Sequence, residues 1–262
     1  MNALKRNNVK IIGKGQKPML FAHGYGCDQS MWRYITPAFE EDYKIILFDH
    51  VGFGKADTSA YVLERYSSLQ SYAVDILEIC EELELENVIF VGHSVSAMIG
   101  VLASVLEPDR FSKLVLIGPS PRYINDDNYV GGFTQEGIDG LLNSLDSDYL
   151  AWSNSIAPVI MGNPDKPELG RELAQSFCQS NETIAKEFAR ITFLSDNRAD
   201  LQNLKVPSLI LQCSEDVIAP VEVGEYMHQQ VPQSTLVVLK ATGHCPNLSA
   251  PEETIAAIKA FL

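Results

Sequence analysis

The chain of 262 residues has the composition of an ordinary globular protein, with 46% hydrophobic and 21% charged residues, which excludes disordered and fibrous classes. Its 34 Asp and Glu outnumber its 20 Lys and Arg, giving a formal charge of -14. Phosphate backbones and anionic lipids repel a chain with that balance, so we expect it to bind neither nucleic acid nor membranes.

The N-terminal half begins with strand-like segments. Its opening, MNALKRNNVK, is followed by no apolar signal-peptide core, and no apolar run approaches the length of a membrane span. We therefore expect a cytoplasmic protein. Near-continuous apolar runs, typical of strands covered by helices on both faces, occupy residues 18–24, 43–50, 87–94 and 112–120.

An amphipathic helix is predicted over residues 68–85, between the second and third of these runs. Its apolar stripe consists of Tyr72, Ile76, Ile79 and Leu83, with acidic residues on the opposite face. Short strands that alternate with longer helices are typical of a parallel sheet with crossover helices. The first half of the chain therefore predicts an α/β fold.

After Pro121 the pattern changes. Residues 122–200 contain helix-like segments and no strand-like run, and the breaks YVGGF, MGNPDKP and SNET divide them into about four helices. The remaining predicted elements are strands at 206–216 and 234–244 and helices at 220–231 and 251–262. We interpret residues 1–121 and 201–262 as one α/β core, and residues 122–200 as an inserted helical cap.

Ser94 lies in VGHSVSAMIG, where a buried strand is predicted to pass directly into a helix. A serine at this point can cap the helix, because its oxygen accepts a bond from a free backbone N–H. A serine nucleophile on a sharp strand-to-helix turn needs small neighbours two residues before and after it, and Gly92 and Ser96 meet that need. The motif therefore favours a nucleophile at the carboxyl edge of the sheet.

A base and an orienting acid follow later strands. Asp216 comes directly after one predicted strand, and His244 lies in the loop after the next. The order Ser, Asp, His is the one that this architecture uses for a catalytic triad. Each residue has a simpler reading: Asp216 could cap the helix at Pro220, His244 could be an ordinary loop histidine, and Glu215 is a rival orienting acid.

Donors for a developing oxyanion are predicted in two loops. In AHGYG, Gly24 and Gly26 let the backbone bend so that the N–H of Tyr25 can face the site. The N–H of Val95, at the start of the helix after Ser94, is the second predicted donor. The alternative is that the glycines form a simple strand-ending turn.

Other groups give no metal or cofactor site. His50 and His93 have no acid or cysteine at ligand spacing, and GFGK near residue 52 lacks the pattern of a phosphate-binding loop. No C-x-x-C pair is present, so we read the cysteines as free thiols in a reducing compartment, with Cys27 and Cys245 beside the site loops. The cysteines are Cys27, Cys80, Cys178, Cys213 and Cys245.

With these residues placed, the chain resembles an α/β-hydrolase from end to end. More narrowly, it resembles the family of the bacterial stress-response regulator RsbQ and the plant strigolactone and karrikin receptors. The motifs that carry this resemblance are GYGCDQSMW, GHSVSAMIG, GPSPRYIND, YVGGF, SDYLAW, FLSDNR and ILQCSEDVIAP. FEEDYKIILFDHVG, ILQCSEDVIAP and GHCP make it most similar to the RsbQ side.

The resemblance implies a mostly parallel, eight-stranded sheet with a four-helix cap inserted between the sixth and seventh strands. It also implies an apolar pocket above the serine and slow hydrolysis of a small hydrophobic ester or lactone. Ser94 would be the nucleophile, His244 the base and Asp216 its orienter, with oxyanion donors from Tyr25 and Val95. The implied pocket residues are Tyr25, Tyr123, Phe133, Trp152, Ile156, Phe188 and Phe193.

Two functional hypotheses follow. In the first, the protein is a serine hydrolase that forms an acyl-enzyme. The sharp strand-to-helix turn, or nucleophile elbow, carries a serine here, whereas dehalogenases and epoxide hydrolases need an acid at that position. In the second, it senses a ligand and recruits a PAS-domain phosphatase, with little or no turnover. The resemblance to RsbQ implies such a phosphatase partner and a positive role in the general stress (sigma-B) response.

Overall fold

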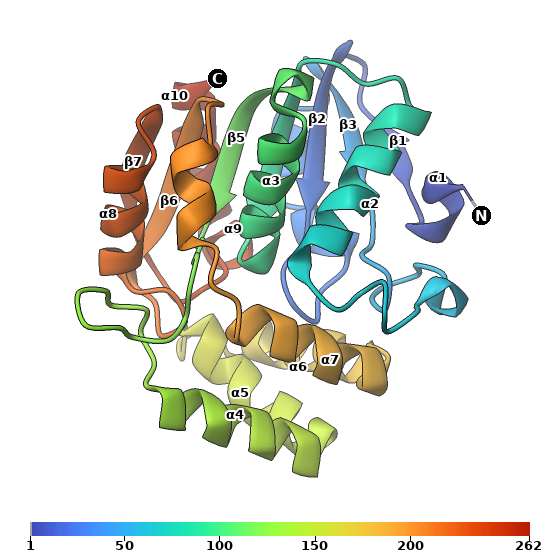
Figure 1. The fold of residues 1–262 in the computed structure, drawn as a ribbon. Coiled ribbons are helices and arrows are strands. Elements are labelled where there is room, and N and C mark those ends of the chain that lie inside the picture. Colours follow the sequence, from blue (N-terminus) through green and yellow to red (C-terminus); the bar gives the residue numbers. More distant parts are fainter. Residues whose placement is uncertain (1) are drawn as a thin grey trace.

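A seven-stranded sheet runs through residues 2–262, the part of the chain that the computed structural model describes (Figure 1). The strands are β1 (Lys10–Ile12), β2 (Lys17–Ala22), β3 (Tyr43–Leu47), β4 (Val88–His93), β5 (Phe111–Ile117), β6 (Ser208–Glu215) and β7 (Ser234–Thr242). Their order is β1-β3-β2-β4-β5-β6-β7. Within the described residues, β1 pairs antiparallel with β3, and every other pair of neighbours is parallel.

The expected count of eight strands is wrong by one. The chain enters the sheet once before β2, as the edge strand β1, which pairs Ile11 with Ile46 of β3. Gly13, with φ +87°, then turns the chain, and the four residues 13–16 leave no length for another strand. The four-helix insertion consequently lies between β5 and β6 rather than between a sixth and a seventh strand.

Helices cover both faces of the sheet, which explains the near-continuous apolar runs. Helices α2 and α3 lie in front of it in Figure 1, and α10 lies behind. All six residues of β4 are buried, and so are Tyr72, Ile76 and Ile79 of the predicted stripe on α2. Leu83, the fourth residue of that stripe, lies just after the end of α2 and is partly buried against the core. The helices outside the insertion are α1 (Ala3–Arg6), α2 (Leu69–Glu82), α3 (Val95–Leu106), α8 (Val221–Gln230), α9 (Pro246–Ser249) and α10 (Pro251–Phe261).

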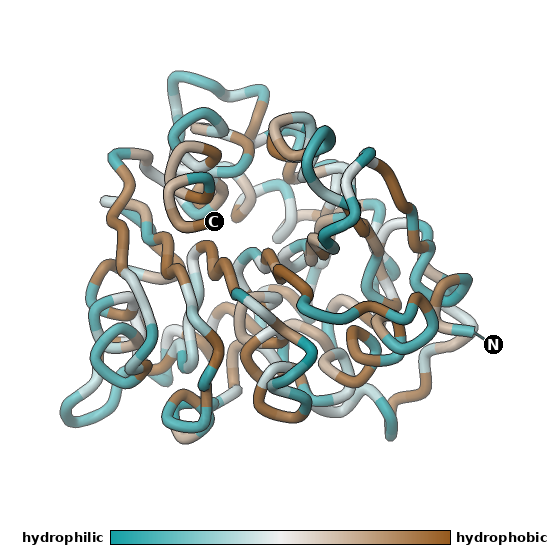
Figure 2. Tube along the Cα trace, turned by 90° about the horizontal axis from the view of Figure 1, so that it is seen from above, coloured by the Kyte–Doolittle hydropathy of each residue, from teal (hydrophilic) through white to brown (hydrophobic). Residues whose placement is uncertain are grey.

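Four helices form a layer across one end of the sheet, and we call them the helical layer (Figure 1). They are α4 (Gln135–Ser147), α5 (Tyr149–Met161), α6 (Pro167–Gln179) and α7 (Glu182–Phe193). An isolated bridge between Arg122 and Asp196 joins the chain before the layer to the chain after it. Figure 2 shows that the loops projecting furthest from the molecule are hydrophilic. Among residues 2–262, we find no helix with both the length and the apolar character needed to cross a membrane.

Candidate active site

Ser94 occupies a strained turn between β4 and α3. Its backbone has φ 57° and ψ -125°, a conformation that residues with a side chain rarely adopt. The turn leaves no room for a larger residue at position 92, since a Cβ on Gly92 would lie 2.6 Å from the carbonyl oxygen of Ser96. The Ser94 N–H donates to the carbonyl of Ile117 at 2.8 Å, which fixes the turn to β5.

Ser96 and two histidines form a buried polar network behind this turn. The Ser96 hydroxyl donates to the carbonyl oxygen of His23, so it accepts a bond from His50 Nε2, 2.7 Å away. The backbone N–H of His50 in turn donates to His23 Nε2 at 3.0 Å. Burial lowers the pKa of His23, and burial together with His23 lowers that of His50 well below its usual value. Both rings are therefore neutral at pH 7.

Ser94, His244 and Asp216 form a continuous chain of hydrogen bonds. His244 Nε2 lies 2.7 Å from Ser94 Oγ, and His244 Nδ1 lies 2.7 Å from Asp216 Oδ2. A carboxylate accepts, so Nδ1 carries the proton and Nε2 accepts from the serine hydroxyl. The rival acid Glu215 is exposed at the end of β6, whereas Asp216 is 8% exposed.

The environment of Asp216 keeps it ionised. Burial alone would raise its pKa, but electrostatic attraction to His244 and the hydrogen bond with it lower the pKa below the ordinary value. The N–H groups of Ile218 and Ala219 add to this effect by donating to Asp216 Oδ1 at 2.8 and 3.2 Å. A carboxylate that accepts several such bonds stays charged at neutral pH, as an orienting acid must.

The two loops predicted to supply oxyanion donors lie against Ser94. A Cβ on Gly24 would lie 3.4 Å from the Ser94 Cβ and 2.5 Å from His93 Nδ1, so this loop approaches too closely for another residue. The turn is closed by the bond from Cys27 N–H to the Gly24 carbonyl at 3.3 Å, and Tyr25 is its second residue. Val95 is the first residue of α3, where an N–H has no partner within the helix.

A small, mostly apolar cavity of about 40 Å³ lies above Ser94 and His244. Four of the predicted pocket residues line it: Tyr25, Tyr123, Trp152 and Phe193. The other residues that line it were not predicted, namely Cys27, His93, Ile160, Leu173, Phe177, Thr192, Ile218 and Cys245. Leu173 and Phe177 are four residues apart on α6, so the apolar stripe of this helix was the signal that could have identified them.

Phe133, Ile156 and Phe188, also predicted for the pocket, are not among the residues that line this cavity. Phe188 stacks on the far side of Tyr25, with ring centroids 6.2 Å apart, and Phe133 packs against Phe193. Ile156 is a half-buried residue that packs against the hydrophobic core. The rings of Phe188 and Phe133 thus support two residues of the cavity wall, Tyr25 and Phe193.

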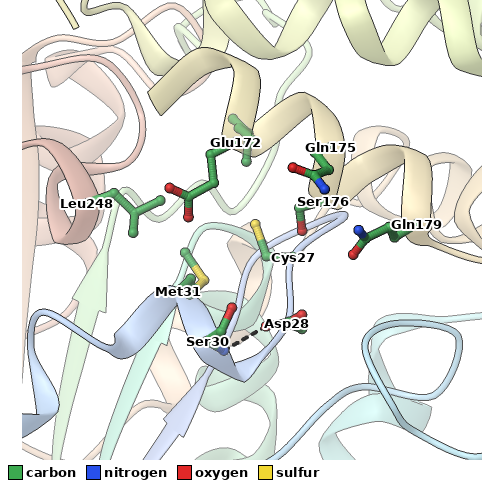
Figure 3. Close-up of a pocket in the computed structure, with 10 residues that line it drawn as sticks. Cys27, Asp28, Ser30, Met31, Glu172, Gln175, Ser176, Gln179 and Leu248 are labelled. Carbon is green, nitrogen blue, oxygen red and sulfur yellow. Dashed lines mark hydrogen bonds between the residues drawn. The ribbon is translucent and has the colours of Figure 1, made fainter. Parts of the chain in front are cut away.

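A second cavity of about 180 Å³ adjoins the first (Figure 3). It lies between the loop after β2 and helix α6, and the two cavities share Cys27 and Leu173 in their walls. In contrast to the apolar cavity, it is lined mainly by polar side chains. These include Asp28, Ser30, Glu172, Gln175, Ser176 and Gln179.

The described residues 2–262 contain no group of three or more His, Cys, Asp or Glu side chains that could hold a metal ion. Cys27 and Cys245, which line the apolar cavity, are free and buried. Burial raises the pKa of both thiols, so neither is a reactive thiolate at neutral pH.

This sheet, elbow and hydrogen-bonded Ser-His-Asp set are those of an α/β-hydrolase, and the chain belongs to the alpha/beta hydrolase family, whose model matches residues 19–257. It is 41% identical over 257 residues to karrikin insensitive 2 receptor IA of Petunia hybrida, covering 97% of this chain and 94% of the relative. It is 39% identical over 253 residues to a strigolactone esterase of Arabidopsis thaliana, covering 96% and 94%. A solved hydrolase from Oleispira antarctica is 42% identical and superposes with a TM-score of 0.96, covering 99% and 95%. The chain is therefore a hydrolase.

Proposed function

We propose that this hydrolase cleaves small hydrophobic esters or lactones through an acyl-enzyme on Ser94. The observation that carries the proposal is the pair of 2.7 Å contacts that links Ser94 Oγ through His244 to Asp216. A serine hydroxyl is a weak nucleophile near neutral pH and needs a base within hydrogen-bond reach. His244 meets this need, and Asp216 holds it in the required tautomer.

In the acylation step, Ser94 Oγ attacks the carbonyl carbon while its proton passes to His244 Nε2. The carbonyl oxygen becomes an oxyanion, which the N–H groups of Tyr25 and Val95 stabilise. Collapse of this intermediate breaks the bond to the leaving alcohol, which takes the proton from His244. In a lactone the leaving oxygen stays attached to the acyl group.

In the deacylation step, water takes the place of the leaving alcohol. His244 Nε2 removes a proton from the water as its oxygen attacks the acyl carbon. A second intermediate forms, and its collapse returns the proton to Ser94 Oγ and releases the carboxylic acid. Free enzyme is thereby regenerated without any redox or metal chemistry.

The size and lining of the cavity support the substrate class. A space of about 40 Å³ among aromatic and aliphatic side chains accepts a small apolar acyl group beside Ser94. The strigolactone esterase and receptor names of the relatives support a hydrophobic ester or lactone as well. We propose that residues 122–200 act as a cap that excludes water from this cavity.

Hydrolysis of p-nitrophenyl acetate tests the proposal. We expect wild-type protein to release p-nitrophenol, and Ser94→Ala to lose at least about 10³-fold in kcat, because acylation needs Oγ. A fluorophosphonate should label wild type at Ser94 and fail to label the variant. Ser104→Ala, on the same helix with a hydroxyl that bonds the Val101 carbonyl, is the matched control and should keep full activity. Full activity in Ser94→Ala would exclude the proposed nucleophile.

A second candidate function is ligand sensing, which the receptor names of relatives at about 40% identity favour. In that case the ligand-bound protein recruits a partner, and the resemblance to RsbQ proposes a PAS-domain phosphatase of the sigma-B response. The test is pull-down of such a purified phosphatase with and without a hydrolysable ligand. Recruitment by Ser94→Ala as strong as by wild type would show that sensing does not need turnover, and its absence under all conditions would exclude the regulatory role.

A further inference from the structure

The backbone of His244 is held between the sheet core and the helical layer. Its N–H donates to the carbonyl oxygen of Ile160, near the end of α5, at 2.9 Å. Its own carbonyl oxygen lies 2.7 Å from His93 Nε2, at the end of β4. The histidine of the proposed triad therefore has one support from each part of the molecule.

The core support is a hydrogen bond that the neutral ring of His93 donates to the His244 carbonyl. Burial, followed by the neighbouring His244, lowers the pKa of His93 to about 3. A carbonyl oxygen can only accept, so the neutral ring carries its proton on Nε2 and donates it to His244. The core also holds the preceding residue, since Gly243 N–H donates to the Glu215 carbonyl at 2.7 Å.

The layer support is a close contact between two backbone segments. Helix α5 is capped by Gly162, which has a left-handed conformation with φ 63° and lies directly against Gly243, with φ +79°. A Cβ on Gly243 would lie 1.8 Å from the carbonyl oxygen of Met161, and a Cβ on Gly162 would lie 2.7 Å from the Cα of Gly243. No side chain fits between the two segments, so the position of one determines the position of the other.

Asn163 joins these segments through its side chain. Its Nδ2 donates to the carbonyl oxygen of Met161 at 2.6 Å and to that of Thr242 at 3.0 Å. The Thr242 hydroxyl donates in return to the Gly162 carbonyl at 3.3 Å. Asn163 thus bridges the end of α5 to the strand end that leads into His244.

We propose that Asn163 is a positioning residue for His244, through which the end of α5 holds the imidazole at hydrogen-bond distance from Ser94. The proposal rests on the proposed serine hydrolase function. Asn163 touches neither Ser94 nor the apolar cavity, so its effect reaches the reaction through the backbone of Thr242 and Gly243. Catalytic geometry is sensitive to such displacements, because a shift of about 1 Å can cost about 100-fold in rate.

A purely structural role gives different results from a positioning role. If Asn163 only terminates α5, its loss lowers the melting temperature and leaves kcat unchanged. If it positions His244, its loss lowers kcat with little change in KM, because the base is misplaced while the substrate cavity is intact. Fluorophosphonate labelling should slow by the same factor, since it too depends on His244 activating Ser94.

The experiment compares Asn163→Ala and Asn163→Asp with wild type, using p-nitrophenyl acetate at a temperature well below the melting transition. We expect kcat to fall about 10-fold in both variants, with KM within about 2-fold of wild type. Asn163→Asp has almost the same shape but no donor on that side chain, so it separates donation from packing. Asn154→Ala is the matched control, because the Asn154 amide lies on the exposed face of α5 and donates to Leu150; it should behave as wild type.

Thr242→Val provides an independent test if the Asn163 variants fold poorly. It removes only the hydroxyl bond to Gly162, and we expect kcat and labelling to fall about 2- to 3-fold. Wild-type kcat and labelling rates in Asn163→Asp, or in Thr242→Val where the former does not fold, would overturn the positioning role. This failure differs from failure of the proposed function, in which Ser94→Ala would itself remain active.

Discussion

Helix α3, which follows Ser94, and helix α4 of the helical layer are buried to very different extents. Ten of the twelve residues of α3 are buried, whereas three of the thirteen residues of α4 are. α3 packs against the sheet and against α2, while α4 presents one apolar stripe, Ile138, Leu142 and Leu145, and is otherwise solvated. The proposed nucleophile is therefore fixed in a dense core, whereas α4, which contributes no residue to the wall of the apolar cavity, is held by one narrow apolar stripe.

The strongest loss of activity should come from breaking the proposed triad inside the core. Asp216→Asn should lower kcat about 10³- to 10⁴-fold, because an amide does not hold the imidazole in the tautomer that accepts from Ser94. We expect the melting temperature to stay close to that of wild type. Ester hydrolysis and thermal unfolding, measured together, check both statements. Glu215→Gln, at the exposed neighbouring position, is the control and should leave kcat unchanged.

Paired cavity mutations compare the stability of the two regions directly. Phe90→Ala removes a fully buried ring of β4 and should lower the free energy of unfolding by about 3–5 kcal/mol. Leu142→Ala, in α4, should cost about 2–3 kcal/mol and expose the helical layer to proteolysis before the core opens. Urea unfolding and limited proteolysis measure these effects. First cleavage in the core of Leu142→Ala would contradict the comparison.

Acid should act on the core through its buried histidines. Burial lowers the pKa of His23, His50 and His93, and the last falls to about 3. The unfolded chain binds these protons below pH about 6.5 while the folded core does not, so stability is complete above that pH and falls as the pH drops toward 3. Each histidine contributes up to about 1.4 kcal/mol per pH unit. No histidine occurs in residues 122–200.

Urea midpoints between pH 7 and pH 5 measure this dependence. His50→Gln removes one of the three buried groups and should reduce the slope of stability against pH by about a third, whatever its effect on stability at pH 7. His228→Gln, at an exposed position on α8, provides the matched control and should leave the slope unchanged. An equal slope in His50→Gln would show that other groups dominate the acid response.

A weaker effect on activity should come from opening the wall that separates the two cavities. Leu173 lies in the wall of both, so Leu173→Ala should connect the apolar cavity to the polar cavity shown in Figure 3. We expect kcat/KM for p-nitrophenyl hexanoate to rise about 10-fold relative to kcat/KM for the acetate. The joined cavities leave room for a longer acyl chain. An unchanged ratio would indicate that acyl groups extend in another direction.

Most of the sheet could be predicted because its strands are buried on both faces. The runs at 18–24, 87–94 and 206–216 correspond to β2, β4 and β6, each shifted by two residues or fewer at either end. β1 could not be found in this way. It has three mostly exposed residues, and its strand conformation depends on pairing with β3 rather than on a local pattern.

The proximity of the three proposed catalytic residues could be predicted from their order along the chain. Ser94, Asp216 and His244 each follow a strand of one parallel sheet, so the fold alone brings their backbones to the same edge. The residues that line the cavity were harder to predict, because they depend on how the helices of the helical layer pack over the sheet. Phe188 and Phe193 lie five residues apart on α7, yet only Phe193 reaches the cavity, while Phe188 packs behind Tyr25.

At position 94 the fold holds a residue with a side chain at φ 57°. Such strain costs about 1–3 kcal/mol and persists only because the surrounding core enforces it. Glycine relieves that cost, so Ser94→Gly should raise the melting temperature while abolishing hydrolysis. In this fold, activity and thermal resistance make opposing demands on one position, and selection for robustness alone would favour an inert protein.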